Sequence, residues 1–161
     1  MNKLEELEKK YKELGEEIER LKSKSTEKRW RADFAEDYFY IDDVGNILCD
    51  DDEDIGPDIF RYNNRNYFRT QAEAEKALNK IIIYNQLKDL AERLNDGETI
   101  NWNDSNQRKW RICFDTSAKK LDYEYNLTYK CLAEIYCLDP DFLDRALDEI
   151  GEEDLMKLFE E

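Results

Sequence analysis

The chain has 161 residues, a formal net charge of −15 and no histidine. Its 10 Tyr, 7 Phe and 3 Trp predict one folded domain, because disordered chains of high charge carry few aromatic residues. Without histidine, Ser-His and Cys-His nucleophile pairs are excluded, and the four cysteines lack the C-x-x-C spacing of zinc sites. We therefore expect no enzyme activity, no metal and no cofactor.

Residues 2–23 carry a heptad pattern, with apolar residues at alternating spacings of three and four between Glu and Lys. A stripe of two apolar positions in seven is typical of a coiled coil rather than of a core helix. We predict that this helix, within a first segment 1–26, makes the protein a homodimer. Docking of the helix on the chain's own domain is the open alternative. The predicted self-association seam consists of Leu4, Leu7, Tyr11, Leu14, Ile18 and Leu21.

Residues 27–161 are predicted to form an acidic α+β domain that begins with a β-hairpin. Residues 38–41 and 47–49 have the aromatic and β-branched composition of strands, and Val-Gly-Asn lies in the turn between them. Residues 50–57 read as an acidic loop. Residues 60–68 are interpreted as a second, weaker pair of strands, with Asn63 and Asn64 in the turn.

The longest apolar-periodic segment of this domain is 70–95, and we predict that it is the central helix. Thr70 and Glu73 have the spacing of a capping box, in which each residue satisfies a backbone amide of the other. Apolar residues recur at helical spacing from Ala74 to Leu94. The Asn-Asp-Gly sequence at 95–97 then predicts the end of the helix.

Two further strands are predicted after the central helix, at 109–115 and 121–127, with a turn between them. Residues 133–138 are interpreted as a third short strand, and a helix over 127–137 is the alternative. Pro140 is placed at the first position of a helix that ends at Gly151, and residues 152–159 form one more short helix. The predicted fold class is α+β, with an N-terminal coiled-coil helix, a central helix packed on an antiparallel sheet, and short C-terminal helices.

The negative charge is concentrated in two blocks. Residues 34–58 carry ten acidic and no basic side chains, and residues 139–161 carry ten acidic and two basic ones. One interpretation is a solvated surface that keeps the protein soluble. The other is a surface that imitates nucleic-acid phosphate and occupies a basic groove, since a field of one sign steers a basic partner. The candidate partner-binding residues are Asp42, Asp43, Asp50, Asp51, Asp52, Glu53, Asp54, Asp58, Glu152, Glu153 and Asp154.

Four sequence motifs carry a family resemblance. They are YFYIDDVGNI at 38–47, FRYNNRNYFRTQAEAEKAL at 60–78, INWNDSNQRKWRICFD at 100–115 and IYCLDPDFLDRALDEIGEEDLMKLFEE at 135–161. Residues 30–161 resemble small acidic accessory proteins of phages and prophages of Gram-positive bacteria. The resemblance implies the context of host-defence inhibitors, among them anti-CRISPR and anti-restriction proteins, and it carries over no functional residues.

We therefore predict a non-enzymatic inhibitor that binds a host defence protein, such as a CRISPR or restriction nuclease, through its acidic surface. Direct nucleic-acid binding is disfavoured because the chain has no basic face. The absence of a membrane-spanning stretch and of a signal peptide predicts a cytoplasmic protein. One alternative is a coiled-coil assembly adaptor. A second is a protein that sequesters a signalling nucleotide with arginines drawn from Arg61, Arg65, Arg69, Arg108 and Arg111.

Overall fold

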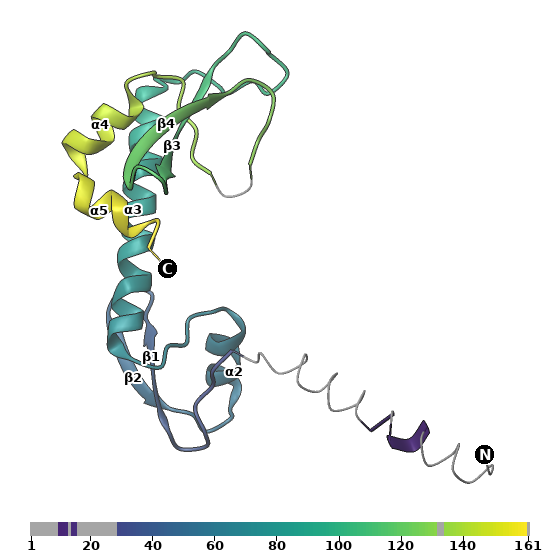
Figure 1. The fold of residues 1–161 in the computed structure, drawn as a ribbon. Helices are drawn as coiled ribbons and strands as arrows, with labels where there is room; N and C mark the ends of the chain where they lie inside the picture. The colour runs from purple at the N-terminus through teal and green to yellow at the C-terminus, as the bar shows by residue number, and fades with distance from the viewer. Residues whose placement is uncertain (1–9, 13, 16–28, 132–133, 161) are drawn as a thin grey trace.

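The structure is a computed structural model that describes residues 10–12, 14–15, 29–131 and 134–160. It is an α+β fold in which one long helix, α3 (Gln71–Leu94), joins two lobes (Figure 1). The first lobe contains β1 (Asp37–Ile41), β2 (Ile47–Asp51) and α2 (Gly56–Asn63). The second lobe contains β3 (Lys109–Asp115), β4 (Lys120–Asn126), α4 (Phe142–Glu149) and α5 (Glu152–Lys157).

The predicted central helix is confirmed as α3, and its ends are fixed by local hydrogen bonds. The Thr70 hydroxyl accepts from the Glu73 amide at 3.2 Å. The Glu73 carboxylate accepts a hydrogen bond from the backbone amide of Arg69 and not, as the capping box predicts, from that of Thr70. At the other end, Asp96 and Gly97 have positive φ angles of 45° and 81°, which turn the chain out of the helix.

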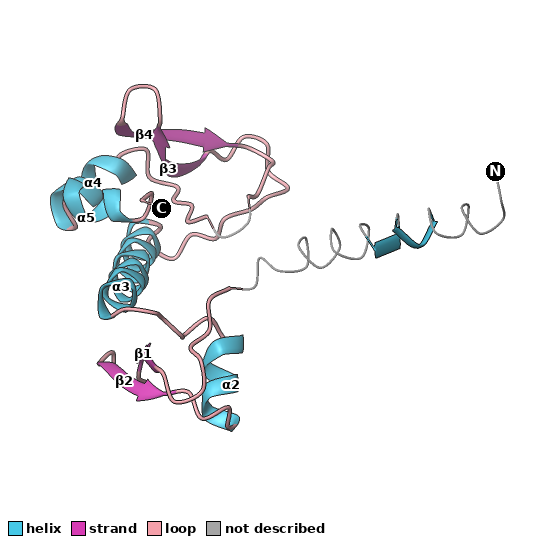
Figure 2. Ribbon diagram, turned by 60° about the horizontal axis from the view of Figure 1, so that its bottom comes forward, coloured by secondary structure: helices cyan, strands magenta, loops and turns pink. Residues whose placement is uncertain are grey.

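The predicted single sheet is replaced by two separate antiparallel hairpins, β1–β2 and β3–β4. The hairpins form within each lobe, and α3, about 36 Å long at 1.5 Å per residue, holds the lobes apart. Figure 2 shows the β1–β2 hairpin and α2 at one end of α3, and the β3–β4 hairpin at the other. The two-residue periodicity of a strand reveals strands but not which strands share a sheet.

The first hairpin is confirmed with the predicted turn. Its register places Asp37 opposite Asp51 and Ile41 opposite Ile47. In the turn, the Asp42 carboxylate accepts from the amides of Val44 at 3.0 Å and Asn46 at 2.7 Å. These bonds close the loop and lower the pKa of the Asp42 carboxyl, with the Asn46 side chain and amide as the main causes.

The strand pair predicted at 60–68 is wrong, because residues 60–63 belong to helix α2 and the rest is a turn that ends in a single bridge between Phe68 and Phe39. Pro57 lies in the first turn of α2, where its missing amide costs no helical hydrogen bond. The Asp58 carboxylate accepts from the Ile55 amide at 3.3 Å and so caps the same turn. The predicted acidic loop is likewise shorter, since Asp50 and Asp51 lie in β2.

The second lobe confirms the predicted hairpin at β3 and β4 within one residue. The third strand is reduced to a single bridge between Cys137 and Trp110, and residues 127–131 and 134–137 are not helical. Helix α4 begins at Phe142, two residues after Pro140, so that proline is not its first residue. Gly151, with a φ of 94°, separates α4 from α5 as expected.

Each lobe has its own core. In the first lobe, the Tyr38 and Tyr67 rings stack with 3.9 Å between centroids, and Ala32 is buried beside them. The second core combines residues of α3, α4, α5 and β4, among them Leu87, Leu90, Leu121, Phe142 and Leu155. Between the two cores the middle of α3 is less covered, and Ile81 and Ile82 are exposed.

The N-terminal coiled coil lies almost entirely outside the described residues. Of the predicted seam the structure describes Tyr11 and Leu14, which are helical and 84% and 65% exposed. The homodimer and the boundary between 26 and 27 stay predictions. In the described part of the chain, no helix is long and apolar enough to cross a membrane.

Candidate functional site

The predicted partner-binding acids divide into buried and exposed residues. Asp52 and Asp58 are each only 2% exposed, which removes them from the predicted binding surface. Asp52 lies in the acidic run that joins β2 to α2, and Asp58 lies in the first turn of α2. The sequence alone does not distinguish them from the exposed carboxylates nearby. Each of these carboxylates holds part of the first lobe together, and so has a structural role.

Asp52 is the centre of a network that fixes the segment before β1. The guanidinium of Arg31 donates to both of its carboxylate oxygens, at 2.7 and 2.9 Å. The hydroxyl of Tyr67 donates at 2.7 Å and the amide of Asp54 at 2.8 Å. The pKa of the Asp52 carboxyl lies below its usual range mainly because of the hydrogen bonds from Arg31, although burial alone would raise it.

Asp58 and Asp50 bind a second set of groups in the same lobe. The Tyr38 hydroxyl donates to Asp58 at 2.7 Å. Arg61 donates to Asp50 at 2.7 Å, and its guanidinium lies 3.5 Å from the centroid of the Tyr40 ring. The charge of Asp50 is therefore compensated within the lobe, although the residue is partly exposed.

Of the remaining acids of the first block, Asp42 is half-buried and Asp43 is exposed in the hairpin turn. The others lie toward the opposite end of the hairpin and form an exposed acidic surface that consists of Glu36, Asp37, Asp51, Glu53 and Asp54. Asp37 and Asp51 lie directly opposite each other in the hairpin, where like charges destabilise a strand pair. Cys49, two residues before Asp51 in β2 and opposite Phe39, has a pKa raised first by desolvation and then by the charges of Asp37, Asp50 and Asp51. Of these acids, Asp54 is paired with Arg31 at 2.8 Å.

The acids of the second block lie in the other lobe. Glu152, Glu153 and Asp154 form the first turn of α5, where negative side chains are favoured by the positive end of the helix dipole. Asp154 is also paired with Lys157 at 2.6 Å. A partner that contacts both blocks would have to extend along α3, since β1–β2 and α4 pack against different parts of that helix.

The five arginines considered for a nucleotide site do not converge. Arg61 is paired with Asp50, and Arg111 is paired with Glu124 and Glu134 in the second lobe. Arg69 lies over the Trp30 ring at 5.7 Å and Arg108 over the Tyr125 ring at 4.9 Å. The guanidinium groups of Arg61 and Arg111 are thus held by carboxylates of the chain itself.

Arg65 is exposed at the rim of a groove between the β1–β2 turn and the middle of α3. This groove has a volume of about 570 Å³ and a mostly apolar floor that includes Ile41, Phe68, Leu78 and Ile81. Its two charged side chains, Asp42 and Arg65, are of opposite sign, so the groove has no net basic character for a phosphate.

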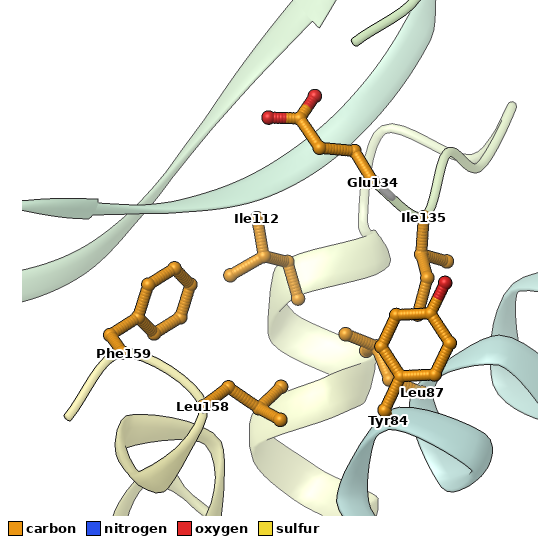
Figure 3. Close-up of a pocket in the computed structure, with 7 residues that line it drawn as sticks. All are labelled: Tyr84, Leu87, Ile112, Glu134, Ile135, Leu158 and Phe159. Atoms are coloured by element: carbon orange, nitrogen blue, oxygen red, sulfur yellow. The ribbon is translucent and has the colours of Figure 1, made fainter. Parts of the chain in front are cut away.

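A second cavity lies in the other lobe between α3, β3 and the residues that follow α5 (Figure 3). Its volume is about 230 Å³, below the range of roughly 300–1,000 Å³ that is usual for small-molecule sites. Leu158 and Phe159 cover it from the C-terminal side. Figure 3 shows the Glu134 carboxylate directed away from the apolar side chains that line the cavity.

No group of three or more Cys, Asp or Glu side chains within the described residues is arranged to hold a metal ion. The groups that sequence analysis missed are Arg31 and Tyr67, the partners of Asp52. They lie 21 and 15 residues from Asp52 along the chain, so no short-range pattern connects them. Lys109 was also missed: it is fully buried and its ammonium donates to the carbonyls of Asp104 and Leu127, both at 2.7 Å.

Comparisons with known proteins give no relative from which a site could be transferred. No protein-family model, no curated protein and no solved structure matches the chain. The resemblance to acidic phage proteins therefore stays a prediction from the sequence motifs.

Proposed function

We propose that the protein is a non-enzymatic inhibitor that binds the basic, nucleic-acid-binding groove of a host defence nuclease with its acidic surface. The defence context comes from the resemblance to phage and prophage accessory proteins. The nature of the contact comes from the charge on the first lobe. Asp51 and Glu53 of the candidate set are exposed there, and the structure adds Asp37.

The observation that carries the proposal is the opposition of Asp37 and Asp51 in a two-stranded sheet. Folding gains nothing from two like charges at facing positions, whose effect on a strand pair is destabilising by up to about 1 kcal/mol. Residues 34–58 also contain no Lys or Arg, so no basic side chain of the hairpin itself offsets these charges. A binding role for the carboxylates explains why the hairpin carries them.

Inhibition of cleavage by purified nucleases tests the proposal. Full-length protein is added to an RNA-guided CRISPR nuclease and to a restriction endonuclease, both from a Gram-positive host, and DNA cleavage is followed over time. The variant Asp37→Asn/Asp51→Asn/Glu53→Gln is expected to lose inhibition. The matched control Asp148→Asn/Glu152→Gln/Glu153→Gln removes the same charge from the second lobe and is expected to keep most of it. Equal inhibition by both variants would contradict the assignment to the first lobe.

An assembly adaptor is the second candidate, and the exposure of Tyr11 and Leu14 favours it. These two consecutive positions of the seam are 84% and 65% exposed, so the described part of the helix presents an apolar surface to solvent. The substitutions Tyr11→Ser and Leu14→Ser in the full chain are expected to dissociate a dimer, as measured by sedimentation velocity. If the double variant also loses every partner while the acidic-surface variant keeps them, the adaptor function is correct and the inhibitor proposal is wrong.

A further inference from the structure

We define an apolar patch of the first lobe by four exposed side chains, three of which lie in or next to α2 and one in the turn before β1. It consists of Phe34, Ile55, Ile59 and Phe60, which are 78%, 48%, 41% and 69% exposed. Ile55 caps α2 and Ile59 follows one turn later, so these two side chains share a face of the helix. Large apolar side chains that gather on a surface commonly mark an interaction site.

Backbone hydrogen bonds bring the turn that carries Phe34 beside the segment that leads into α2. The Ala35 amide donates to the Asp52 carbonyl at 2.8 Å, and the Asp52 amide donates to the Glu36 carbonyl at 3.1 Å. Ala35 has a φ of 63°, a conformation that a residue with a side chain rarely adopts without support from its surroundings. The turn is therefore held in one conformation with Phe34 at its exposed position.

The charged residues around the patch determine the kind of partner it fits. Asp33 and Glu36, in the turn of Phe34, and Asp51 and Glu53, in the segment that leads to Ile55, are exposed, and the sequence has no basic residue between Arg31 and Arg61. A second copy of this surface would place like charges against each other, and nucleic acid would be repelled for the same reason. A protein with an apolar depression bordered by Lys and Arg side chains complements both the patch and its rim.

We infer that the apolar patch is the centre of the contact with the target protein, and that the surrounding acids steer the encounter. This inference rests on the proposed function for the basic character of the target. Interfaces draw most of their affinity from a few central apolar or aromatic residues, while rim charges act mainly on the association rate. The target is thus recognised by shape and apolar burial, in addition to its affinity for phosphate-like charge.

Site-specific photo-crosslinking in the full chain tests the inference. A benzophenone amino acid replaces Phe60 or Phe34, and, as the matched control, Val44, which is 77% exposed at the hairpin turn of the same lobe. Crosslinking is carried out in Gram-positive host lysate, and the captured protein is identified and purified. The patch positions, and not Val44, are expected to capture one and the same protein.

Binding of that purified protein then decides the role of the patch. Phe60→Ser is expected to weaken it at least tenfold, mainly through faster dissociation, while Val44→Ser leaves it within twofold. Capture that is no stronger at Phe60 than at Val44, capture of a second copy of this chain, or unchanged affinity of Phe60→Ser would each overturn the inference. A captured partner that binds through the patch but has no nucleic-acid-binding groove would support the patch and refute the proposed function.

Discussion

Replacement of Asp52 by asparagine tests whether the buried ion pair stabilises the first lobe. Asn has the same shape, so the change removes the charge without leaving a cavity. The Asp52 side chain is only 3% exposed, but that of Arg31 is 31% exposed, so water takes over part of the solvation of the guanidinium. Removing one partner of a fully buried ion pair lowers the free energy of unfolding by about 3–5 kcal/mol. We expect a loss of about 2–3 kcal/mol for Asp52→Asn, because Arg31 keeps its ion pair with Asp54.

Urea unfolding followed by far-ultraviolet circular dichroism measures this loss. With an m value of about 2 kcal/mol per molar urea, the midpoint is expected to fall by about 1–1.5 M. The matched control is Asp51→Asn, one residue earlier, which is exposed and faces Asp37. It is expected to leave the midpoint unchanged or to raise it slightly, since it relieves the repulsion of two like charges.

The pH dependence supplies a second check on Asp52. Because its pKa in the folded state is lowered, the stabilisation is complete above the unfolded value of about 3.9 and is lost as the pH falls through the folded pKa. The difference in unfolding free energy between wild type and Asp52→Asn should therefore shrink below about pH 4. A difference under about 0.5 kcal/mol at pH 7, or one that does not change in acid, would refute the role assigned to Asp52.

Three further outcomes follow from the contacts in the two lobes. Lys109→Met leaves two carbonyls without their donor and should destabilise the second lobe by about 1–3 kcal/mol in urea unfolding. Thr70→Ala removes the N-cap of α3 and should cost about 1 kcal/mol, whereas Thr70→Ser should be nearly neutral. Tyr38 and Tyr67 have pKa values raised first by burial and then by hydrogen bonds to carboxylates, so both should stay protonated near pH 11 while exposed tyrosines ionise. Absorbance at alkaline pH measures this, and ionisation of both residues in step with the exposed tyrosines would contradict their burial. Because the folded-state pKa values are raised, the stability that these two tyrosines contribute is lost as the pH rises above the unfolded value of about 10.

Signals that lie close together in the sequence predict this fold well. The Thr70 cap, the Asn-Asp-Gly stop after α3 and the turn at Asp42 act within a few residues of their partners, and each is present. Helix α2 is not predicted, because the Asn63-Asn64 pair indicates a turn between strands, and only the structure shows that Pro57 and Asp58 begin a helix. Competing local signals over eight residues cannot be decided without the packing of the first lobe.

The features that the sequence does not predict depend on contacts between residues that are far apart in the chain. The separation of the hairpins into two lobes depends on which end of α3 each hairpin packs against. Ala74 and Leu90, near the two ends, are both buried and follow the same helical periodicity in the sequence, so the sequence does not separate the two cores (Figure 1). The division of the acidic run into buried and exposed carboxylates depends on Arg31 and Tyr67, far away in the chain. Charge counts therefore locate the acidic block but overstate the surface by including Asp52 and Asp58.

Competition with DNA for a purified defence nuclease tests the central claim most directly. The affinity of the full chain for the nuclease is measured by titration at increasing salt, with and without duplex DNA in the groove. The proposal predicts that the two ligands exclude each other and that binding weakens with salt, as for phosphate contacts. Simultaneous binding of protein and DNA, or an affinity that neither salt nor the Asp37→Asn/Asp51→Asn/Glu53→Gln variant alters, would contradict it.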